Sequence, residues 1–305
     1  MVGILKYKHV KAQSAMEYLM TYGWAILIIG IALAALFELG VFNSANYAPR
    51  AQPGSCSVSK ASYPVSLQGI CTNEIPQFTA QFNGQTSNVV LSEINQEGNT
   101  NSITFTVWFN TISLPSTMPA WPMVFGDTNA GTREGYDLYV SDSSGYVGYV
   151  TFERFDGCCG YSSASHVSSS LPISSGTWYF AAGTFDGNTL TLYLDGTPYA
   201  VSGSGNITPN LRMNLGAGDA SYAPGSGNYG NFQISNFQVY DTALSQNSIE
   251  ALYQEGIGGA PINLQSLIGW WPLNGNTNDY SGNGNNGTAY SVAYSSGWTS
   301  GYSQP

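Results

Sequence analysis

The chain has 305 residues, of which 9% are charged and 13% are aromatic, and glycine alone accounts for 36. The aromatic content excludes a disordered chain, because it is enough to fill a hydrophobic core, and the many small turn-forming residues are typical of a β-rich extracellular protein. The net charge of −10, without a basic patch, excludes a nucleic-acid-binding protein, because such a surface repels phosphate.

A basic head precedes a long apolar segment at the N-terminus. Residues 1–12 contain three lysines and no acid, and residues 18–37 are mostly apolar and uncharged. About 20 such residues are enough to cross a bilayer as a helix. The lysines favour a cytoplasmic head and an exported remainder. We expect residues 13–43 to form this helix.

Three interpretations of the segment compete. It could be a simple membrane anchor, or a conventional secretory signal cut after Ala32-Leu33-Ala34, which fits an A-x-A site. It could also be a prepilin-type leader. Glu17 separates the three, because an unpaired carboxylate at the edge of an apolar helix is costly. An ordinary anchor has no use for a carboxylate there.

The string from Lys11 to Glu17, KAQSAME, resembles the class III signal peptide of archaeal type IV pilin-like proteins. The resemblance implies that a prepilin peptidase cuts on the cytoplasmic side between Ala12 and Gln13, which makes residues 1–12 the leader. Gln13 would then be the first mature residue. Glu17 would be the fifth, the position at which the family carries glutamate.

Cleavage would create a new amine close to Glu17. In a stack of staggered helices, Glu17 can pair with the Gln13 amine of a neighbouring subunit, which neutralises both charges and sets the register. Such an interface does not close on itself, so it propagates as a filament. The expected partners are therefore other copies of the chain and the prepilin peptidase. The precursor would lie in the membrane and the product in an extracellular filament.

Residues 44–72 are expected to be a linker followed by a cysteine loop, because Pro49 and Pro53 end the helix. An even number of cysteines in an exported chain favours disulfides. A metal site is less favoured, because histidine is absent at ligand spacing. Four cysteines allow three pairings and all stay open, although the first two would close a short loop. The four are Cys56, Cys71, Cys158 and Cys159.

Residues 73–256 consist of short runs of β-branched and aromatic residues between turns. Two Asp-Gly turns are typical of hairpins, and Ser245–Glu255 is the one segment with a helical pattern. The predicted fold is therefore mostly β, an antiparallel sandwich after an N-terminal helix. The clearest predicted strands are Ile103–Ile112, Tyr136–Val140, Tyr146–Phe152, Trp178–Phe185, Thr189–Leu194 and Phe232–Tyr240.

Two strings, GTWYFAAGTFDGNTLTLYLDGTPYAV and NFQISNFQVYDTALSQNSIEALYQEG, resemble the middle hairpins and the closing strand and helix of laminin-G-like, concanavalin A-type domains. Phe82-Asn83-Gly84 followed by Val89-Val90-Leu91 resembles an early strand pair of the same family. The resemblance implies a jelly-roll sandwich used mostly for binding carbohydrate or protein. Glycans or cell-surface proteins are thus expected partners.

One departure from this family concerns residues 257–305. The family's Trp-Pro strand and D-x-S-G-N-G turn usually come first, but here they come last, at Gly269–Gly275 and Asp279–Gly284. The domain could be circularly permuted, with residues 262–290 folding back as the missing edge strand. The segment could instead add a strand to a neighbouring subunit, or form an independent fragment.

The Asp279 turn could also bind calcium. Oxygen-bearing side chains recur at alternate positions, at Asp279, Ser281, Asn283 and Asn285, and a glycine occupies the sixth position, as in calcium loops. No acid occupies the twelfth position, so a plain Asn-Gly turn is the alternative. Any calcium here is expected to be structural.

Exposed aromatic residues are the candidate ligand-binding residues, because aromatic rings in polar loops can stack on sugars. Trp298 is a further exposed candidate, whereas Trp108 and Trp178 fall within strand patterns and are expected in the core. Catalysis is not expected, because closely spaced acids on one strand are absent. Asp137 and Asp142 come nearest, without a paired glutamate. The ligand-binding candidates are Trp121, Tyr161, Tyr222 and Tyr229. A monomeric anchored or secreted lectin is the alternative to a filament subunit.

Overall fold

The computed structural model forms two compact units, Met1–Tyr47 and Ala48–Pro305. The structure describes residues 13–39, 41–42, 47–61, 63–72, 74–91, 94–95, 102–114, 121–127, 134–141, 145–156, 165–203, 210–211, 213–218 and 228–305.

Helix α1 (Gln13–Glu38) makes up most of the first unit. Its described side chains, from Met20 onward, are all exposed, and Met20–Glu38 is long and apolar enough to cross a membrane. The helix ends at Glu38, about one turn before residue 43, where the sequence predicted its end. The Val41 N–H binds the Leu36 carbonyl at 3.0 Å, a six-to-one bond typical of a helix end.

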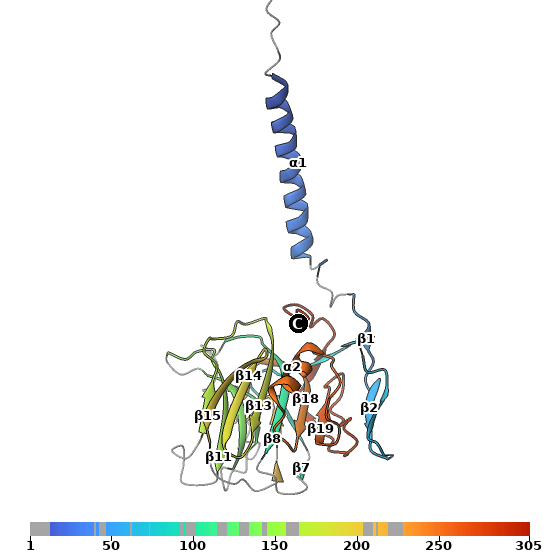
Figure 1. Ribbon diagram of the computed structural model, residues 1–305, viewed down its shortest axis with the longest axis vertical. Helices are drawn as coiled ribbons and strands as arrows, with labels where there is room; N and C mark the ends of the chain where they lie inside the picture. Colours follow the sequence, from blue (N-terminus) through green and yellow to red (C-terminus); the bar gives the residue numbers. More distant parts are fainter. Residues whose placement is uncertain are drawn as a thin grey trace, which may run out of the picture. The chain divides into compact units, whose positions relative to one another are not determined.

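The second unit is a sandwich of two antiparallel sheets, as predicted (Figure 1). In the described residues, the first sheet has seven strands, in the spatial order β12 (Ser165–Ser168), β11 (Val150–Asp156), β10 (Glu134–Val140), β9 (Met123–Asp127), β17 (Met213–Leu215), β6 (Asn88–Val90) and β20 (Thr288–Tyr290). The second has eight, in the order β15 (Thr197–Ser202), β14 (Thr189–Leu194), β13 (Trp178–Phe185), β8 (Ile103–Thr111), β18 (Phe232–Tyr240), β5 (Thr79–Gln81) and β21 (Ala293–Ser295), with β19 (Leu267–Trp271) also paired to β18.

Three small ladders complete the described strands. The parallel pair β1 (Arg50–Ala51) and β4 (Ile75–Pro76) ties the linker to the sandwich. The hairpin of β2 (Cys56–Ser59) and β3 (Ser66–Gly69) forms the cysteine loop. Strands β7 (Ile94–Asn95) and β16 (Asn210–Leu211) form the third pair.

The core between the two sheets follows from alternation along strands such as β8. Phe105, Val107 and Phe109 point into it and are fully buried, because successive side chains of a strand point to opposite faces. Rings from the two sheets meet there. The ring centroid of Phe125 lies 5.2 Å from that of Phe105 and 5.2 Å from that of Phe237. These contacts bury large apolar area at favourable aromatic spacing.

The outer face of the eight-stranded sheet carries a second aromatic layer. Trp108 lies under helix α2 (Gln246–Gln254), where its ring stacks on that of Tyr253 with the centroids 5.9 Å apart. The Trp108 ring also meets the Tyr302 ring edge to face, with the centroids 5.5 Å apart. The helix begins as predicted, because the Ser245 hydroxyl accepts the Ser248 N–H at 3.2 Å and acts as its N-cap. Trp108 and Trp178 are buried, which confirms that prediction.

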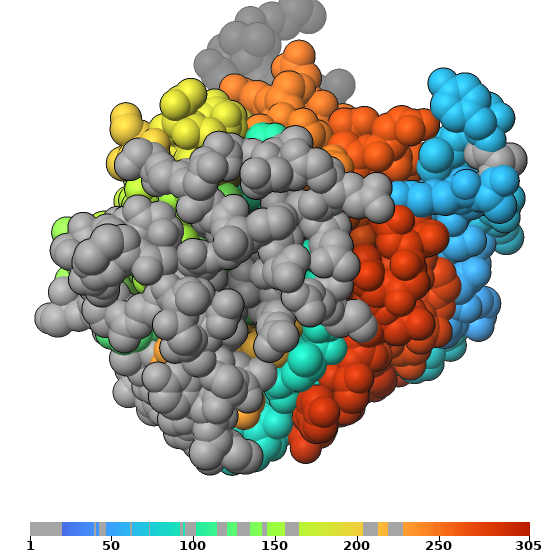
Figure 2. All heavy atoms as spheres, turned by 90° about the horizontal axis from the view of Figure 1, so that it is seen from below, coloured from blue at the N-terminus to red at the C-terminus, as the bar shows by residue number. Residues whose placement is uncertain are grey.

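The C-terminal segment folds back onto its own sandwich. β19 pairs with one end of β18 and β5 pairs with the other end, so the two strands share one edge of β18. β20 then joins β6 in the opposite sheet, and β21 joins β5. Figure 2 shows this red segment lying between the blue cysteine-loop region and the teal strands. Of the three explanations, the structure has the intramolecular one, in which residues 262–290 supply the missing edge strand.

Candidate functional site

Two predicted ligand-binding aromatics lie at one end of the seven-stranded sheet. Trp121 and Tyr229 come from distant parts of the chain, but Met123 forms a parallel bridge with Tyr229 and donates to the Asn228 carbonyl at 3.0 Å. The Trp121 side chain is 36% exposed, and its backbone has a φ of 62°, which is uncommon for a bulky residue. The other two predicted residues, Tyr161 and Tyr222, lie outside the described residues.

Two tyrosines that the sequence pattern did not indicate lie at the same end. Tyr146 and Tyr149 form an edge-to-face pair with ring centroids 5.7 Å apart, and Tyr146 is 61% exposed. The predicted strand from Tyr146 is wrong at its start, because Gly145 and Gly148 adopt φ values of 88° and 84° and form a turn. The strand begins at Val150 instead.

Backbone hydrogen bonds place this turn beside the Trp121 segment. Val140 donates to the Pro122 carbonyl at 3.1 Å, and Ser141 donates to the Tyr149 carbonyl at 2.8 Å. We call the set of Trp121, Tyr146, Tyr149 and Tyr229 the aromatic end. The two glycines that form the turn are the one local signal that could have indicated Tyr146 as a loop residue.

The outer face of the seven-stranded sheet carries a row of three ionisable side chains, Asp137, Glu153 and His166. Asp137 faces Glu153 across β10 and β11, and Glu153 faces His166 across β11 and β12. The sequence pattern indicated no glutamate paired with Asp137, but Glu153 lies opposite it on the neighbouring strand. Asp142 lies outside the described residues. Gly126 makes room for the row, because a Cβ there would lie 3.0 Å from Asp137 Oδ1.

Burial is the main influence on the pKa of Glu153 in this row. It raises the pKa of Glu153, while the nearby His166 and a hydrogen bond from the Tyr139 hydroxyl oppose the rise. The pKa of Tyr139 is also raised, chiefly by burial and then by the charge of Glu153. Asp137 is only 5% exposed, whereas Glu153 is partly exposed. The row can bind hydroxyl groups through Glu153.

The turn predicted as a calcium loop is held together by its own hydrogen bonds. Asp279 Oδ1 accepts the Ser281 N–H and Oδ2 accepts the Asn285 N–H, both at 2.8 Å. Asn283 Oδ1 accepts the Lys60 ammonium at 2.9 Å. A calcium ion would compete with these donors and be repelled by the lysine. The arrangement therefore fits the plain Asn-Gly turn and does not fit calcium.

The cysteine loop is closed by a disulfide between Cys56 and Cys71. The predicted short-loop pairing is therefore present, whereas Cys158 and Cys159 lie outside the described residues. Of the predicted processing residues, Ala12 also lies outside them. Gln13 and Glu17 fall within the backbone of α1. The expectation that Trp298 is exposed is wrong, because its ring is 1% exposed and packs on Trp178 at 5.6 Å.

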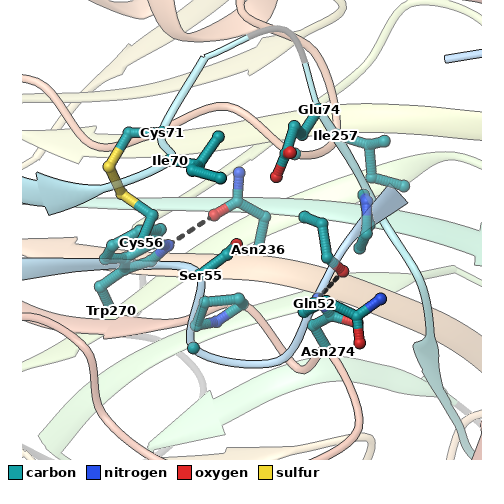
Figure 3. A pocket seen from close by; sticks show the side chains of 15 residues that line it. Gln52, Ser55, Cys56, Ile70, Cys71, Glu74, Asn236, Ile257, Trp270 and Asn274 are labelled. Carbon is teal, nitrogen blue, oxygen red and sulfur yellow. Dashed lines mark hydrogen bonds between the residues drawn. A yellow bond between two sulfur atoms is a disulfide. The ribbon is translucent and has the colours of Figure 1, made fainter. Parts of the chain in front are cut away.

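A pocket lies between the cysteine loop and the sandwich (Figure 3). It has about 460 Å³ of empty space, part of which is open solvent. The disulfide and Ile70 line it from the loop, and Trp270 and Pro272 line it from β19 and the residues after it. This location is not evident from local sequence, because its two walls are about 200 residues apart. We call it the cysteine-loop pocket.

Comparison with known proteins adds a family to this geometry. Residues 83–250 match the family model of the concanavalin A-like lectin/glucanase superfamily. No curated protein sequence matches the chain.

Several solved structures are similar to this chain, and the first of them, with a TM-score above 0.5, shares its fold. A carbohydrate-binding candidate from Bacteroides ovatus is 15% identical with a TM-score of 0.52, over 76% of this chain and 66% of that one. A heptameric SAP-like pentraxin from Limulus polyphemus is 13% identical with a TM-score of 0.49, over 71% and 94% of the two chains. Domains LG4–5 of the mouse laminin α1 chain are 14% identical with a TM-score of 0.40, over 61% and 48%. At these identities the likeness concerns the fold alone.

Proposed function

Because the chain belongs to the concanavalin A-like lectin/glucanase superfamily, we propose that its sandwich is the carbohydrate-binding part of an exported surface protein. The aromatic end is the observation that carries this proposal. Trp121 and Tyr146 are exposed, and Tyr149 and Tyr229 are partly exposed. Aromatic rings have flat apolar faces and, in Trp and Tyr, a polar group, which suits a sugar with its apolar ring faces and peripheral hydroxyls. The carbohydrate binding ascribed to the Bacteroides ovatus protein, which shares the fold, also supports it.

A glycan array probed with residues 48–305 tests this proposal. The array should include neutral, acidic and amine-bearing oligosaccharides. Trp121→Ala removes the largest ring of the aromatic end, and we expect at least a tenfold loss of affinity, or about 1.4 kcal/mol. Tyr63→Ala is the matched control, because Tyr63 is 93% exposed and lies in the cysteine loop. Equal affinities for wild type and Trp121→Ala would contradict the proposed site.

We further propose that the chain is a subunit of a type IV pilus-like filament that displays this module. Helix α1 supports the proposal, since its described side chains are exposed over more than five turns. Apolar surface of this extent does not remain in water. Lipid would cover it in the precursor, and neighbouring helices would cover it in the filament. In such a bundle, Glu17 would pair with the Gln13 amine of a neighbour.

The alternative is a monomeric lectin held at the cell surface by α1. The same exposed helix fits it, because Met20–Glu38 is long enough to span a bilayer. Mass spectrometry of the mature N-terminus separates the two. A chain that starts at Gln13 supports the filament, and an intact Met1 supports the anchored lectin. A start near Ala35 would indicate a secreted lectin.

Electron microscopy of the processed protein then tests assembly directly. Glu17→Ala should abolish filaments while the sandwich stays folded, because the variant leaves the amine of a neighbour without its partner. Glu38→Ala, at the other end of the same helix, is the matched control and should assemble normally. Normal filaments from Glu17→Ala would refute the role assigned to Glu17.

A further inference from the structure

The cysteine-loop pocket contains a carboxylate, Glu74, with one oxygen that receives no hydrogen bond from the described residues. Glu74 Oε2 is buried and has no hydrogen-bond partner among them. Figure 3 shows the Glu74 side chain on the wall of the pocket. A buried carboxylate oxygen without a donor is unfavourable. A donor supplied by a ligand in the pocket would remove this cost.

Arg50, on the neighbouring strand, does not supply that donor. Arg50 pairs with Ile75, next to Glu74, in the β1–β4 ladder. Its guanidinium lies over the Trp298 ring, 5.6 Å from the centroid, which is a cation–π arrangement. None of the residues that line the pocket in the described structure is lysine, arginine or histidine. Arg50 Nη1 is also buried without a hydrogen-bond partner among the described residues, so it does not donate to Glu74. The lining thus contains one carboxylate and no cation, a composition that favours a cationic ligand.

The two asparagine side chains of the pocket already have hydrogen-bond partners. Asn236 Oδ1 accepts the Trp270 indole N–H at 2.8 Å, and its Nδ2 donates to the Gly259 carbonyl at 2.8 Å. Asn274 Oδ1 accepts the Phe78 N–H at 2.9 Å, and Asn274 Nδ2 donates to the Ala51 carbonyl at 2.8 Å. These bonds hold the wall rigid, so ligand binding would need little reorganisation.

The remaining lining residues define the kind of ligand. Within the described part of the chain, the side chains of Gln52 and Ser55 make no hydrogen bond. They are therefore able to bind the hydroxyl groups of a ligand. Ile70 and Ile257 provide apolar contact on the other side. A metal ion is a poor fit, because calcium takes six to eight oxygens and the lining contains a single carboxylate. A protonated amine on a small hydroxylated ring fits this combination.

We propose that the cysteine-loop pocket binds the ammonium group of an amino sugar. Glu74 accepts hydrogen bonds from the ammonium, and Gln52 and Ser55 bind the adjacent hydroxyls. This inference rests on the proposed carbohydrate-binding function and adds a second subsite to it. The site is distinct from the aromatic end, because none of the four residues of the aromatic end lines the pocket.

Calorimetry with the full chain in detergent micelles tests the proposal. The probes are a glucosamine tetramer and its fully N-acetylated form, which has the same length without the positive charge. We expect wild type to bind the glucosamine tetramer at least tenfold more tightly. Glu74→Gln keeps the shape of the side chain and removes its charge, so it should abolish this preference. Asp186→Asn, which changes an exposed acid in a distant turn, should keep the preference and so excludes a general effect of the acidic surface.

Ser55→Leu provides a second test that leaves Glu74 unchanged. It fills the pocket, so it should also remove the preference for the glucosamine tetramer. Equal binding of the two tetramers by wild type, or an unchanged preference in both pocket variants, would overturn the inference. So would Glu74-dependent binding of a lysine peptide without binding of the glucosamine tetramer. Failure of all glycans to bind would instead count against the proposed function, whereas retained binding of neutral glycans would preserve it.

Discussion

Asp195 makes the stability of the sandwich depend on pH. It lies in the turn between β14 and β15 with a φ of 47°, and its Oδ1 accepts the Phe180 N–H at 2.8 Å. Burial raises the pKa of its carboxyl from 3.8 to about 6, although the Phe180 hydrogen bond opposes the rise. Its charge also faces Tyr253 of α2, whose pKa is raised by burial, by Asp195 and by Glu250.

The sign of the effect follows from the tighter proton binding of the folded state. The stabilisation from the bound proton is fully present below pH 3.8 and is lost as the pH rises through about 6. A rise of about two pKa units corresponds to roughly 3 kcal/mol. Asp195→Asn removes the charge, keeps an oxygen that can accept the Phe180 N–H, and tolerates a positive φ. We therefore expect it to stabilise the sandwich by about 2–3 kcal/mol above pH 7 and by less than about 0.5 kcal/mol at pH 4.

Urea unfolding of residues 48–305, followed by tryptophan fluorescence at pH 4, 5, 6 and 7.5, measures this difference. Asp186→Asn is the matched control, because Asp186 is an exposed aspartate in the preceding turn, and we expect a smaller change. A difference between wild type and Asp195→Asn that stays constant from pH 4 to pH 7.5 would refute the electrostatic reasoning. So would a variant that is less stable at every pH.

Three further predictions concern packing and covalent closure of the sandwich. Trp271→Ala removes a fully buried ring from β19 and should cost about 3–5 kcal/mol in urea unfolding; a loss below about 1 kcal/mol would contradict its place in the core. Cys71→Ala opens the Cys56 disulfide, whose sequence separation is 15, and should cost about 3 kcal/mol; a thermal melt that reducing agent leaves unchanged in wild type would contradict this. Gly183→Ala places a Cβ 2.5 Å from the Phe152 ring and should cost roughly 1–3 kcal/mol, which calorimetric unfolding would show.

Local pattern was sufficient for the elements themselves. The alternation in Ile103–Thr111 predicted β8 almost to the residue, and it did so because one face of the strand packs in the core. Ser245 predicted the start of α2 through its capping hydroxyl. The uncharged run after residue 17 predicted α1 by length and hydropathy alone. Each of these signals is contained within one helix or one strand.

The candidate sites depended on contacts between distant parts of the chain. Glu153 faces Asp137 only because β10 and β11 pair in one particular register, and a shift by one residue would move the side chain to the other face. Trp298 seemed exposed in its polar sequence context, yet the C-terminal segment carries it onto Trp178. The cysteine-loop pocket likewise joins Glu74 to β19. The sequence by itself therefore determined the N-terminal helix, the clearest strands and the family, because these follow from short-range patterns. Only the tertiary structure decided which charges and rings share a surface, because strand order and register are set by burial of the whole core.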